Sequence, residues 1–166
     1  MLILGVDPGL QKTGWGVIKA QGSSLSYVAS GVIKTRPAES LALRLAHLHN
    51  ELSAVITLYG PEVSALEETF VNRNPASALK LGQARGVLLA ALALQGLEVH
   101  EFSPNKIKKS VVGAGHAGKE QIGMMVKTLL PACGPLSEDE ADALAAAITQ
   151  AHYGAVNRAI YERIMA

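Results

Sequence analysis

The chain opens on LILGVDPG, residues 2–9, a short apolar run that ends on an acid and a turn. Proline fixes φ and glycine tolerates positive φ, so DPG predicts that the opening strand stops abruptly. Two further segments, 13–20 and 25–34, are rich in valine, isoleucine and tyrosine and are separated by Gln21-Gly22. This pattern is typical of strands joined by tight turns, and it predicts a three-stranded antiparallel meander.

The rest of the chain alternates helices and strands. Apolar residues recur at helical spacing over 40–58 and again along 76–95, and a short apolar segment that predicts a strand follows each helix, at 63–67 and at 97–102. Three further helical pieces are expected near Lys106, after Lys119 and over 137–153. Strands separated by helices pair in parallel, so we expect an α/β fold with a five-stranded mixed sheet and helices on both faces.

Composition limits the class of protein. The chain has 166 residues, of which 49% are hydrophobic and 17% charged, which predicts one folded domain over 1–166 and not a disordered chain. The net charge is +1, so a surface for nucleic acid must come from local clusters of lysine and arginine. The most apolar stretch, 87–94, is shorter than the ~20 residues that span a bilayer, and the N-terminus lacks the features of a signal peptide. We therefore expect a cytoplasmic protein that makes no membrane contact.

Acidic residues stand at the ends of three predicted elements. Asp7 closes the first strand, Glu67 and Glu68 close the fourth, and residues 138–142 open the last helix. The carboxyl ends of strands in α/β sheets open onto a common crevice, where these acids can meet. Asp7 alone is equally well explained as a cap of its turn. Because successive strand side chains point to opposite faces, at most one of Glu67 and Glu68 is expected beside Asp7, and periodicity does not decide which.

The acids of the last helix also have an ordinary structural explanation. Ser137 is a good N-cap with Glu140 at the capping-box position, and acids in a first helical turn complement the helix dipole. This explanation fits Asp142 least, because aspartate is a mediocre helix former where the apolar run begins. Asp142 shares a helix face with either Glu138 or Asp139, and spacing leaves both open.

Acids that converge on one site indicate a metal centre. Clustered carboxylates do not all stay ionised without a counter-charge, and oxygen-rich ligand sets suit Mg²⁺ or Mn²⁺. Two such ions, roughly 3.5–4 Å apart, can stabilise both the attacking and the leaving oxygen of a phosphodiester. The sequence has no cluster of cysteine and histidine that would favour zinc.

Residues 113–119, GAGHAGK, fit the nucleotide-binding pattern G-x-x-x-x-G-K. That pattern next requires serine or threonine, but the chain has Glu120, and a lysine-rich helical piece precedes the loop in place of a buried strand. We interpret the segment as a glycine-rich loop that brings Lys119 near a phosphate backbone. Basic residues cluster just upstream and around the second long helix, unless they only form a solvated face: Lys106, Lys108, Lys109, Arg73, Lys80 and Arg85.

Five segments together carry a family resemblance: ILGVDPG (3–9), TGWGVI (13–18), ALEETF (65–70), SALKLGQARG (77–86) and ADALA (141–145). They resemble the bacterial RuvC family of Holliday junction resolvases. The likeness extends from the first strand to about residue 153, and the run 77–86 is highly specific. The resemblance implies a ribonuclease H-like fold.

The resemblance also assigns roles to the acids. The catalytic and metal-binding carboxylates would be Asp7, Glu67, Asp139 and Asp142, which selects Glu67 over Glu68 and Asp139 over Glu138. Two Mg²⁺ ions per subunit are implied, with Mn²⁺ as a possible substitute.

The expected DNA-binding residues are Phe70, Arg73, Lys80, Arg85, Lys108 and Lys119. Lys108 and Lys119 match basic positions that the family uses close to the scissile DNA. Phe70 matches an aromatic near the junction centre, where it would stack on an unpaired base; the alternative is a core phenylalanine.

The implied activity is that of a structure-selective endodeoxyribonuclease. It would resolve four-way junctions by paired symmetric nicks that leave 5′-phosphate and 3′-hydroxyl ends. Two symmetric cuts by subunits with one acid cluster each imply a C₂ homodimer. The apolar helix 76–95, with Gly82 and Gly86 one turn apart, is a candidate for part of the interface, unless it is simply a buried core helix. The branch-migration motor complex is a further expected partner.

Two other functions are compatible with parts of this pattern. An actin-like nucleotide-binding protein also begins with a strand, an aspartate and glycines, but it needs two large lobes and 166 residues supply one. A catalytically silent module would bind the junction without cutting it. The presence of all four acids argues against that module.

Overall fold

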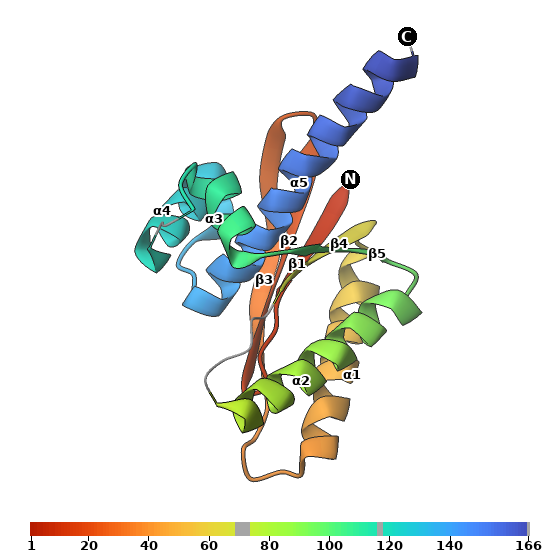
Figure 1. Ribbon diagram of the computed structural model, residues 1–166, viewed down its shortest axis with the longest axis vertical. Coiled ribbons are helices and arrows are strands. Elements are labelled where there is room, and N and C mark those ends of the chain that lie inside the picture. The colour runs from red at the N-terminus through yellow and green to blue at the C-terminus, as the bar shows by residue number, and fades with distance from the viewer. Residues whose placement is uncertain (69–73, 116–117, 166) are drawn as a thin grey trace.

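The computed structural model describes residues 1–68, 74–115 and 118–165, with side chains described as far as residue 154. Its strands form one mixed sheet in the order β3-β2-β1-β4-β5 (Figure 1). They are β1 Leu2–Asp7, β2 Lys12–Gln21, β3 Ser24–Lys34, β4 Val63–Glu67 and β5 Glu98–Phe102. β2 pairs with β1 and β3 in antiparallel fashion, and β4 pairs with β1 and β5 in parallel. The predicted mixed five-stranded sheet is confirmed.

Helices cover both faces of this sheet. They are α1 Leu41–Tyr59, α2 Pro75–Leu94, α3 Pro104–Val112, α4 Lys119–Leu129 and α5 Glu138–Met165, with a short 3₁₀ turn, η1, at Pro131–Cys133. Alternate residues of β1 enter two separate cores, because strand side chains alternate between faces. Ile3 packs in a core with α3, α4 and α5, whereas Leu4 and Val6 pack in a core with α1 and α2. Figure 1 shows the two helical layers on opposite sides of the sheet.

Local signals explain where α1 and α2 begin and end. The Ser40 side chain accepts a hydrogen bond from the Leu43 amide at the start of α1, and Gly60 ends that helix with φ 57°. The Asn74 side chain caps α2, and Pro75 occupies its first turn. The buried face of α1 repeats every four residues, at Arg44, Leu48, Leu52 and Ile56. The first member of this face is charged, a feature that the apolar periodicity does not predict.

α5 extends beyond the predicted end at residue 153 and continues to Met165. Gly154 does not adopt the positive φ that glycine uses to end a helix. The sequence after it, AVNRAIYERIM, contains several good helix formers. In Figure 1 this helix crosses the sheet, and its last turns project past the N-terminus.

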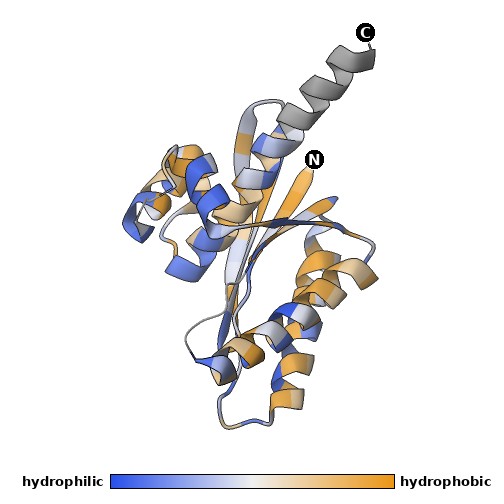
Figure 2. Cartoon of the chain, in the orientation of Figure 1, coloured by the Kyte–Doolittle hydropathy of each residue, from blue (hydrophilic) through white to orange (hydrophobic). Residues whose placement is uncertain are grey.

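α2 is long and apolar enough, by length and composition, to qualify as a membrane span, the one such helix in the described residues. The whole of α2 is therefore long enough to span a membrane, whereas its most apolar stretch, 87–94, is too short. Core helices of soluble proteins pass the same test. α2 packs against α1 through Ala84, Leu88, Ala91 and Leu92, yet Leu79 and Leu94 are 66% and 77% exposed. Apolar colour is visible along both helices in Figure 2, and α2 is not a fully buried core helix.

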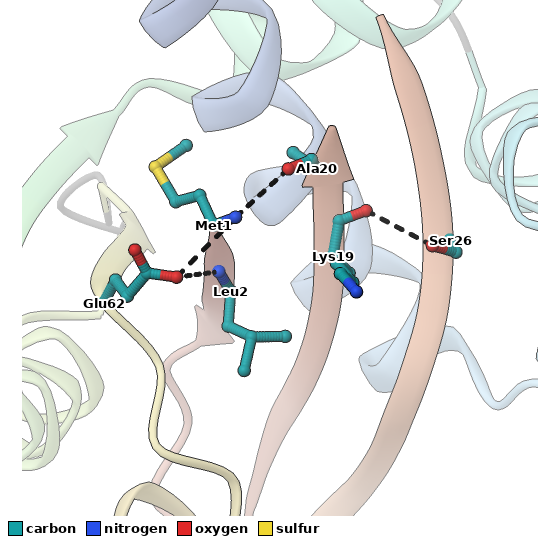
Figure 3. A network of polar contacts seen from close by, with 6 residues as sticks. All are labelled: Met1, Leu2, Lys19, Ala20, Ser26 and Glu62. Atoms are coloured by element: carbon teal, nitrogen blue, oxygen red, sulfur yellow. Dashed lines mark hydrogen bonds and ion pairs between the residues drawn. The ribbon is translucent and has the colours of Figure 1, made fainter. Parts of the chain in front are cut away.

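Polar contacts fix the amino end of β1 (Figure 3). The Met1 amine donates to the Ala20 carbonyl oxygen at 3.2 Å and lies 3.6 Å from a Glu62 carboxylate oxygen. The same oxygen accepts a hydrogen bond of 2.8 Å from the Leu2 amide. Glu62 therefore joins the start of β1 to the residue that precedes β4.

Candidate active site

Sheet register brings the first two acids together. β1 and β4 are parallel, and Val6 pairs with Leu66. Asp7 and Glu67 are the next residues, so they end adjacent strands at the same edge of the sheet. Both line a cleft of about 590 Å³. The predicted convergence of these two acids is confirmed.

Glycines allow α5 to approach this edge closely. A Cβ at Gly5 of β1 would collide with the Ala143 carbonyl oxygen, and a Cβ at Gly14 of β2 would collide with the Asp139 backbone. The first turns of α5 therefore lie directly on the sheet, and Asp142 lines the same cleft as Asp7 and Glu67. Glycine inside a strand is a known sign of close backbone approach. This signal was present in the sequence but did not enter the prediction.

A capping box orients the start of α5. The Glu140 amide donates to the Ser137 hydroxyl oxygen at 3.3 Å, and the Ser137 amide donates to the Glu140 carboxylate at 3.0 Å. The Ser30 hydroxyl of β3 donates to the other Glu140 oxygen at 2.8 Å. Burial opposes ionisation of Glu140, but the hydrogen bonds from Ser137 and Ser30 prevail and lower the pKa of this carboxyl. Glu140 therefore has a structural role, as the capping pattern predicted.

Burial and mutual repulsion dominate the electrostatics of the cleft. Burial is the main cause that raises the pKa of Asp7 to about 8, and the charges of Glu67, Asp142 and Asp139 add to it. Burial and then Asp142 raise the pKa of Glu67 to about 7. The pKa of Asp142 is also raised, by burial first and also by Asp139. Asp139 does not line the cleft, but its charge acts on two acids that do.

Two lysines supply the opposing charge. Lys108 of α3 and Lys119, the first residue of α4, line the cleft with the acids. Lys119 lowers the pKa of Asp7, Glu67 and Asp142, and Lys108 lowers those of Glu67 and Asp142. Lys119 also forms an ion pair with Glu138. Neither Glu138 nor Asp139 lines the cleft, so the choice of Asp139 over Glu138 stays a prediction.

The donor set of the cleft suits a hard divalent cation. Its acidic side chains are all carboxylates, and burial followed by mutual repulsion raises the pKa values of Asp7 and Glu67. Within the described ranges, no three acidic, histidine or cysteine side chains are grouped closely enough to hold an ion as they stand.

Two other expected DNA-binding residues, Arg85 and Lys80, lie outside the cleft lining. Arg85 of α2 forms an ion pair with Glu101 of β5 and does not line the cleft. Lys80 is exposed on α2 and also lies outside the cleft lining. Phe70 and Arg73 fall outside the described residues. The structure therefore brings Lys108 and Lys119, and not Arg85 or Lys80, to the acids.

The cleft contains both Glu67 and Glu68, although strand alternation predicted only one of them there. Glu68 lines it together with Glu67. The expectation that only one of the two lies there was wrong, because β4 ends at Glu67 and Glu68 no longer follows strand alternation. The rest of the lining is mostly apolar, with Leu81, Ile107 and Ile122 among its members.

The glycine-rich segment has the wrong context for a nucleotide-binding loop. The helix α3 precedes it, and Gly113 ends that helix with φ 82°. A phosphate-binding loop of that type follows a strand. The interpretation of 113–119 as a loop that delivers Lys119 therefore agrees with the placement of Lys119 in the cleft.

A five-stranded sheet of this order, with carboxylates at the ends of β1 and β4 and on α5, defines a ribonuclease H-like nuclease fold. The family model described as "Crossover junction endodeoxyribonuclease RuvC" matches residues 3–150. The chain belongs to this RuvC family.

Individual relatives agree with this assignment. The chain is 56% identical to the crossover junction endodeoxyribonuclease RuvC of Rhodospirillum rubrum over 155 residues, which cover 93% of this chain and 92% of that protein. It is also 56% identical to the protein of the same name from Paramagnetospirillum magneticum, over 92% of each chain. The solved structure of T. thermophilus RuvC in complex with a Holliday junction substrate has a TM-score of 0.89 and 34% identity, and the match covers 95% of this chain and 96% of that one.

Proposed function

We propose that this chain cuts four-way DNA junctions, with Asp7, Glu67, Asp139 and Asp142 as its catalytic carboxylates. The observation that carries the proposal is the cleft in which Asp7, Glu67 and Asp142 meet two lysines. Membership of the RuvC family and the similarity to a RuvC structure that holds a Holliday junction support this substrate. Each active site would nick one strand and leave a 5′-phosphate and a 3′-hydroxyl.

The cofactor proposed for the four carboxylates is Mg²⁺, with two ions per subunit and Mn²⁺ as a substitute. The all-oxygen donor set and the elevated pKa values of Asp7 and Glu67 support divalent cations of this kind. When bound, such ions activate water and stabilise the leaving oxygen of a phosphodiester.

The lysines of the cleft are proposed to bind the DNA backbone. Lys108 and Lys119 stand beside the acids, where their charges attract a DNA phosphate that the carboxylates alone would repel. The apolar residues Leu81, Ile107 and Ile122 also line the cleft and would reduce the hydration of a phosphate bound there. Lys80, Phe70 and Arg73 remain proposed DNA contacts. Arg85 also remains a proposed DNA contact, one that would approach DNA from its ion pair with Glu101.

The active form would be a C₂ homodimer, because one acid cluster per chain must make two symmetric cuts. The exposed leucines of α2, Leu79 and Leu94, support this helix as part of the interface. A second expected partner is the branch-migration motor complex. The proposed location of the enzyme is the cytoplasm.

A cleavage assay tests this function. The full-length protein is incubated with a synthetic four-way junction and with a linear duplex of the same sequence, in Mg²⁺, in Mn²⁺ or with a chelator. We expect paired nicks in the junction alone, lost with the chelator, and products that a ligase seals. Junction binding without nicking in either metal would instead identify a silent binding module.

A further inference from the structure

The segment that follows Asp7 is fixed on its inner side by a buried threonine. This segment, residues 8–11, joins β1 to β2. The Thr13 hydroxyl donates to the Gly9 carbonyl oxygen at 2.7 Å and accepts from the Gly9 amide at 3.3 Å. Thr13 is fully buried, and a Cβ at Gly9 would collide with the Lys12 carbonyl oxygen. The turn therefore has little freedom on this side.

The outer side of the segment is held by hydrogen bonds that originate on α1. Arg44 Nε donates to Thr35 Oγ1 at 2.9 Å, and that hydroxyl donates to the Leu10 carbonyl oxygen at 2.5 Å. Arg44 Nη2 donates to the same carbonyl at 3.4 Å. The Thr35 amide adds a bond of 3.1 Å to the Gln11 carbonyl oxygen. We call the Arg44 and Thr35 side chains, with the Leu10 carbonyl that both reach, the outer clamp.

Arg44 is a costly residue for a position that only needs packing. It is 8% exposed and lies on the same face of α1 as Leu48, Leu52 and Ile56. Among the described side chains, no carboxylate lies within ion-pair distance of its guanidinium. A buried cation without a counter-ion is unfavourable. What arginine provides is a rigid planar fork that reaches two acceptors in a fixed geometry.

We propose that Arg44 and Thr35 are positioning residues that hold Asp7 in the active-site cleft. The inference rests on the proposed catalytic role of Asp7. Like charges on Glu67 and Asp142 repel the Asp7 carboxylate. Asp7 is the last residue of β1 to pair with β2, opposite Gly14, and the pairing with β4 already ends at Val6, so the backbone just after Asp7 depends on the contacts of residues 8–11. The outer clamp restrains the backbone three residues after Asp7. It does so from α1, which carries none of the proposed catalytic acids.

Three substitutions isolate the clamp. Thr35→Val keeps the side-chain shape and removes the hydroxyl, and Thr35→Ser retains it. Arg44→Lys keeps the charge and removes the fork. Thr149→Val is the matched control, because Thr149 is fully buried and its hydroxyl also donates to a backbone carbonyl, that of Ala145 at 2.8 Å.

Three readouts separate positioning from stability: the single-turnover nicking rate at saturating junction and Mg²⁺, the junction Kd, and amide hydrogen exchange in the metal-free protein. For Thr35→Val and Arg44→Lys we expect the rate to fall roughly 10- to 100-fold, with the Kd unchanged within about twofold, because a displaced catalytic group impairs chemistry more than binding. Exchange at the amides of residues 9–11 should accelerate. Thr35→Ser and Thr149→Val should resemble the wild type in rate and exchange.

Defined outcomes overturn the inference. A folded Thr35→Val protein with the wild-type rate or wild-type exchange at residues 9–11 excludes the clamp, as does a Thr149→Val protein that loses as much rate. Asp7→Asn is measured in parallel. Nicking by Asp7→Asn would refute the proposed function itself, whereas an inactive Asp7→Asn beside a fully active Thr35→Val would refute only the clamp.

Discussion

The two ends of β1 hold acids in opposite circumstances. At the amino end, Glu62 accepts a hydrogen bond from the Leu2 amide and lies 3.6 Å from the Met1 amine. At the carboxyl end, Asp7, Glu67 and Asp142 share a cleft, and their side chains make no hydrogen bond or ion pair with the part of the chain that the structure describes. The acid near the amino end of β1 therefore stabilises the folded state through its contacts. The acids at the carboxyl end destabilise the folded state when they are ionised.

This difference indicates where the protein binds something that the chain does not supply. Buried acids with raised pKa values cluster at functional sites, because their charges become favourable only when a ligand offsets them. The following experiments test this contrast, from the largest expected effect to the smallest.

Asp7→Asn should have the largest effect. It removes a proposed metal ligand but little positive surface, so we expect the nicking rate to fall by roughly 10³-fold or more while junction affinity survives. Single-turnover cleavage and a binding titration in parallel measure both quantities. The matched control is Glu68→Gln, which removes a neighbouring charge from the same cleft. Retained cleavage by Asp7→Asn, or equal loss in Glu68→Gln, would contradict the choice of acids.

Lys119→Ala should have the next largest effect. Lys119 lowers the pKa values of Asp7, Glu67 and Asp142, so its loss should move the acid limb of the pH–rate profile to higher pH. Loss of one phosphate contact should also reduce the slope of log affinity against log salt by about one and the rate by roughly tenfold. Lys19→Ala is the control, because Lys19 is exposed on β2 opposite Leu2, at the other end of β1 from the acids. Equal effects of the two substitutions would show that Lys119 acts only through general charge.

The periodicity of apolar residues was sufficient to predict the strands of the sheet and most of the helices. The meander at 2–34 and the helix–strand alternation that follows are local patterns, so a single sequence contains them. The predicted end of α5 at residue 153 was wrong. Glycine often ends a helix, but Gly154 keeps a helical conformation and α5 continues to Met165. The predicted capping box at Ser137 and Glu140 is also a local pattern and was correct. Its two residues lie within one helical turn of each other.

Contacts between distant elements could not be derived from periodicity. The ion pair of Arg85 with Glu101 joins α2 to β5, and the bond from Arg44 to Thr35 joins α1 to the end of β3. Both depend on how the elements pack. The entry of Glu68 into the cleft depends on where β4 stops, which is the least predictable property of a strand. The choice of Asp139 over Glu138 came from the family resemblance and not from spacing.

The pH dependence of stability should differ between the wild type and Asp7→Asn. The pKa is raised to about 8 at Asp7 and to about 7 at Glu67, whereas an unfolded chain ionises these groups near 4. Between those pH values the unfolded state has released more protons, so the stability of the metal-free protein should fall as the pH rises. Across pH 5–8 we expect Asp7 to account for a loss on the order of 2 kcal/mol, absent in Asp7→Asn. Thermal midpoints in a chelator measure this difference, and parallel curves for the two proteins would contradict it.

Added Mg²⁺ should reverse this trend. A cation that binds the ionised acids stabilises the folded state by mass action, and more strongly as protons leave. The midpoint of the wild type should therefore rise with Mg²⁺ at pH 8 and change little at pH 5, while Asp7→Asn should respond weakly at both. A wild-type protein that is insensitive to Mg²⁺ at pH 8 would argue against cation binding in the cleft.

Glu62→Gln should have the smallest effect, because it affects the satisfied end of β1. The amide oxygen can still accept from Leu2, so the loss is the charge of an exposed carboxylate beside the Met1 amine, worth about 0.5–1 kcal/mol of unfolding free energy. Glu39→Gln is the control, since its exposed pair with Arg36 links residues only three apart and should change stability less. Denaturant unfolding measures both, and the nicking rate should not change in either variant. A Glu62→Gln protein that lost activity without losing stability would show that the two ends of β1 are coupled, and the acids at the carboxyl end could then no longer be treated as an independent site.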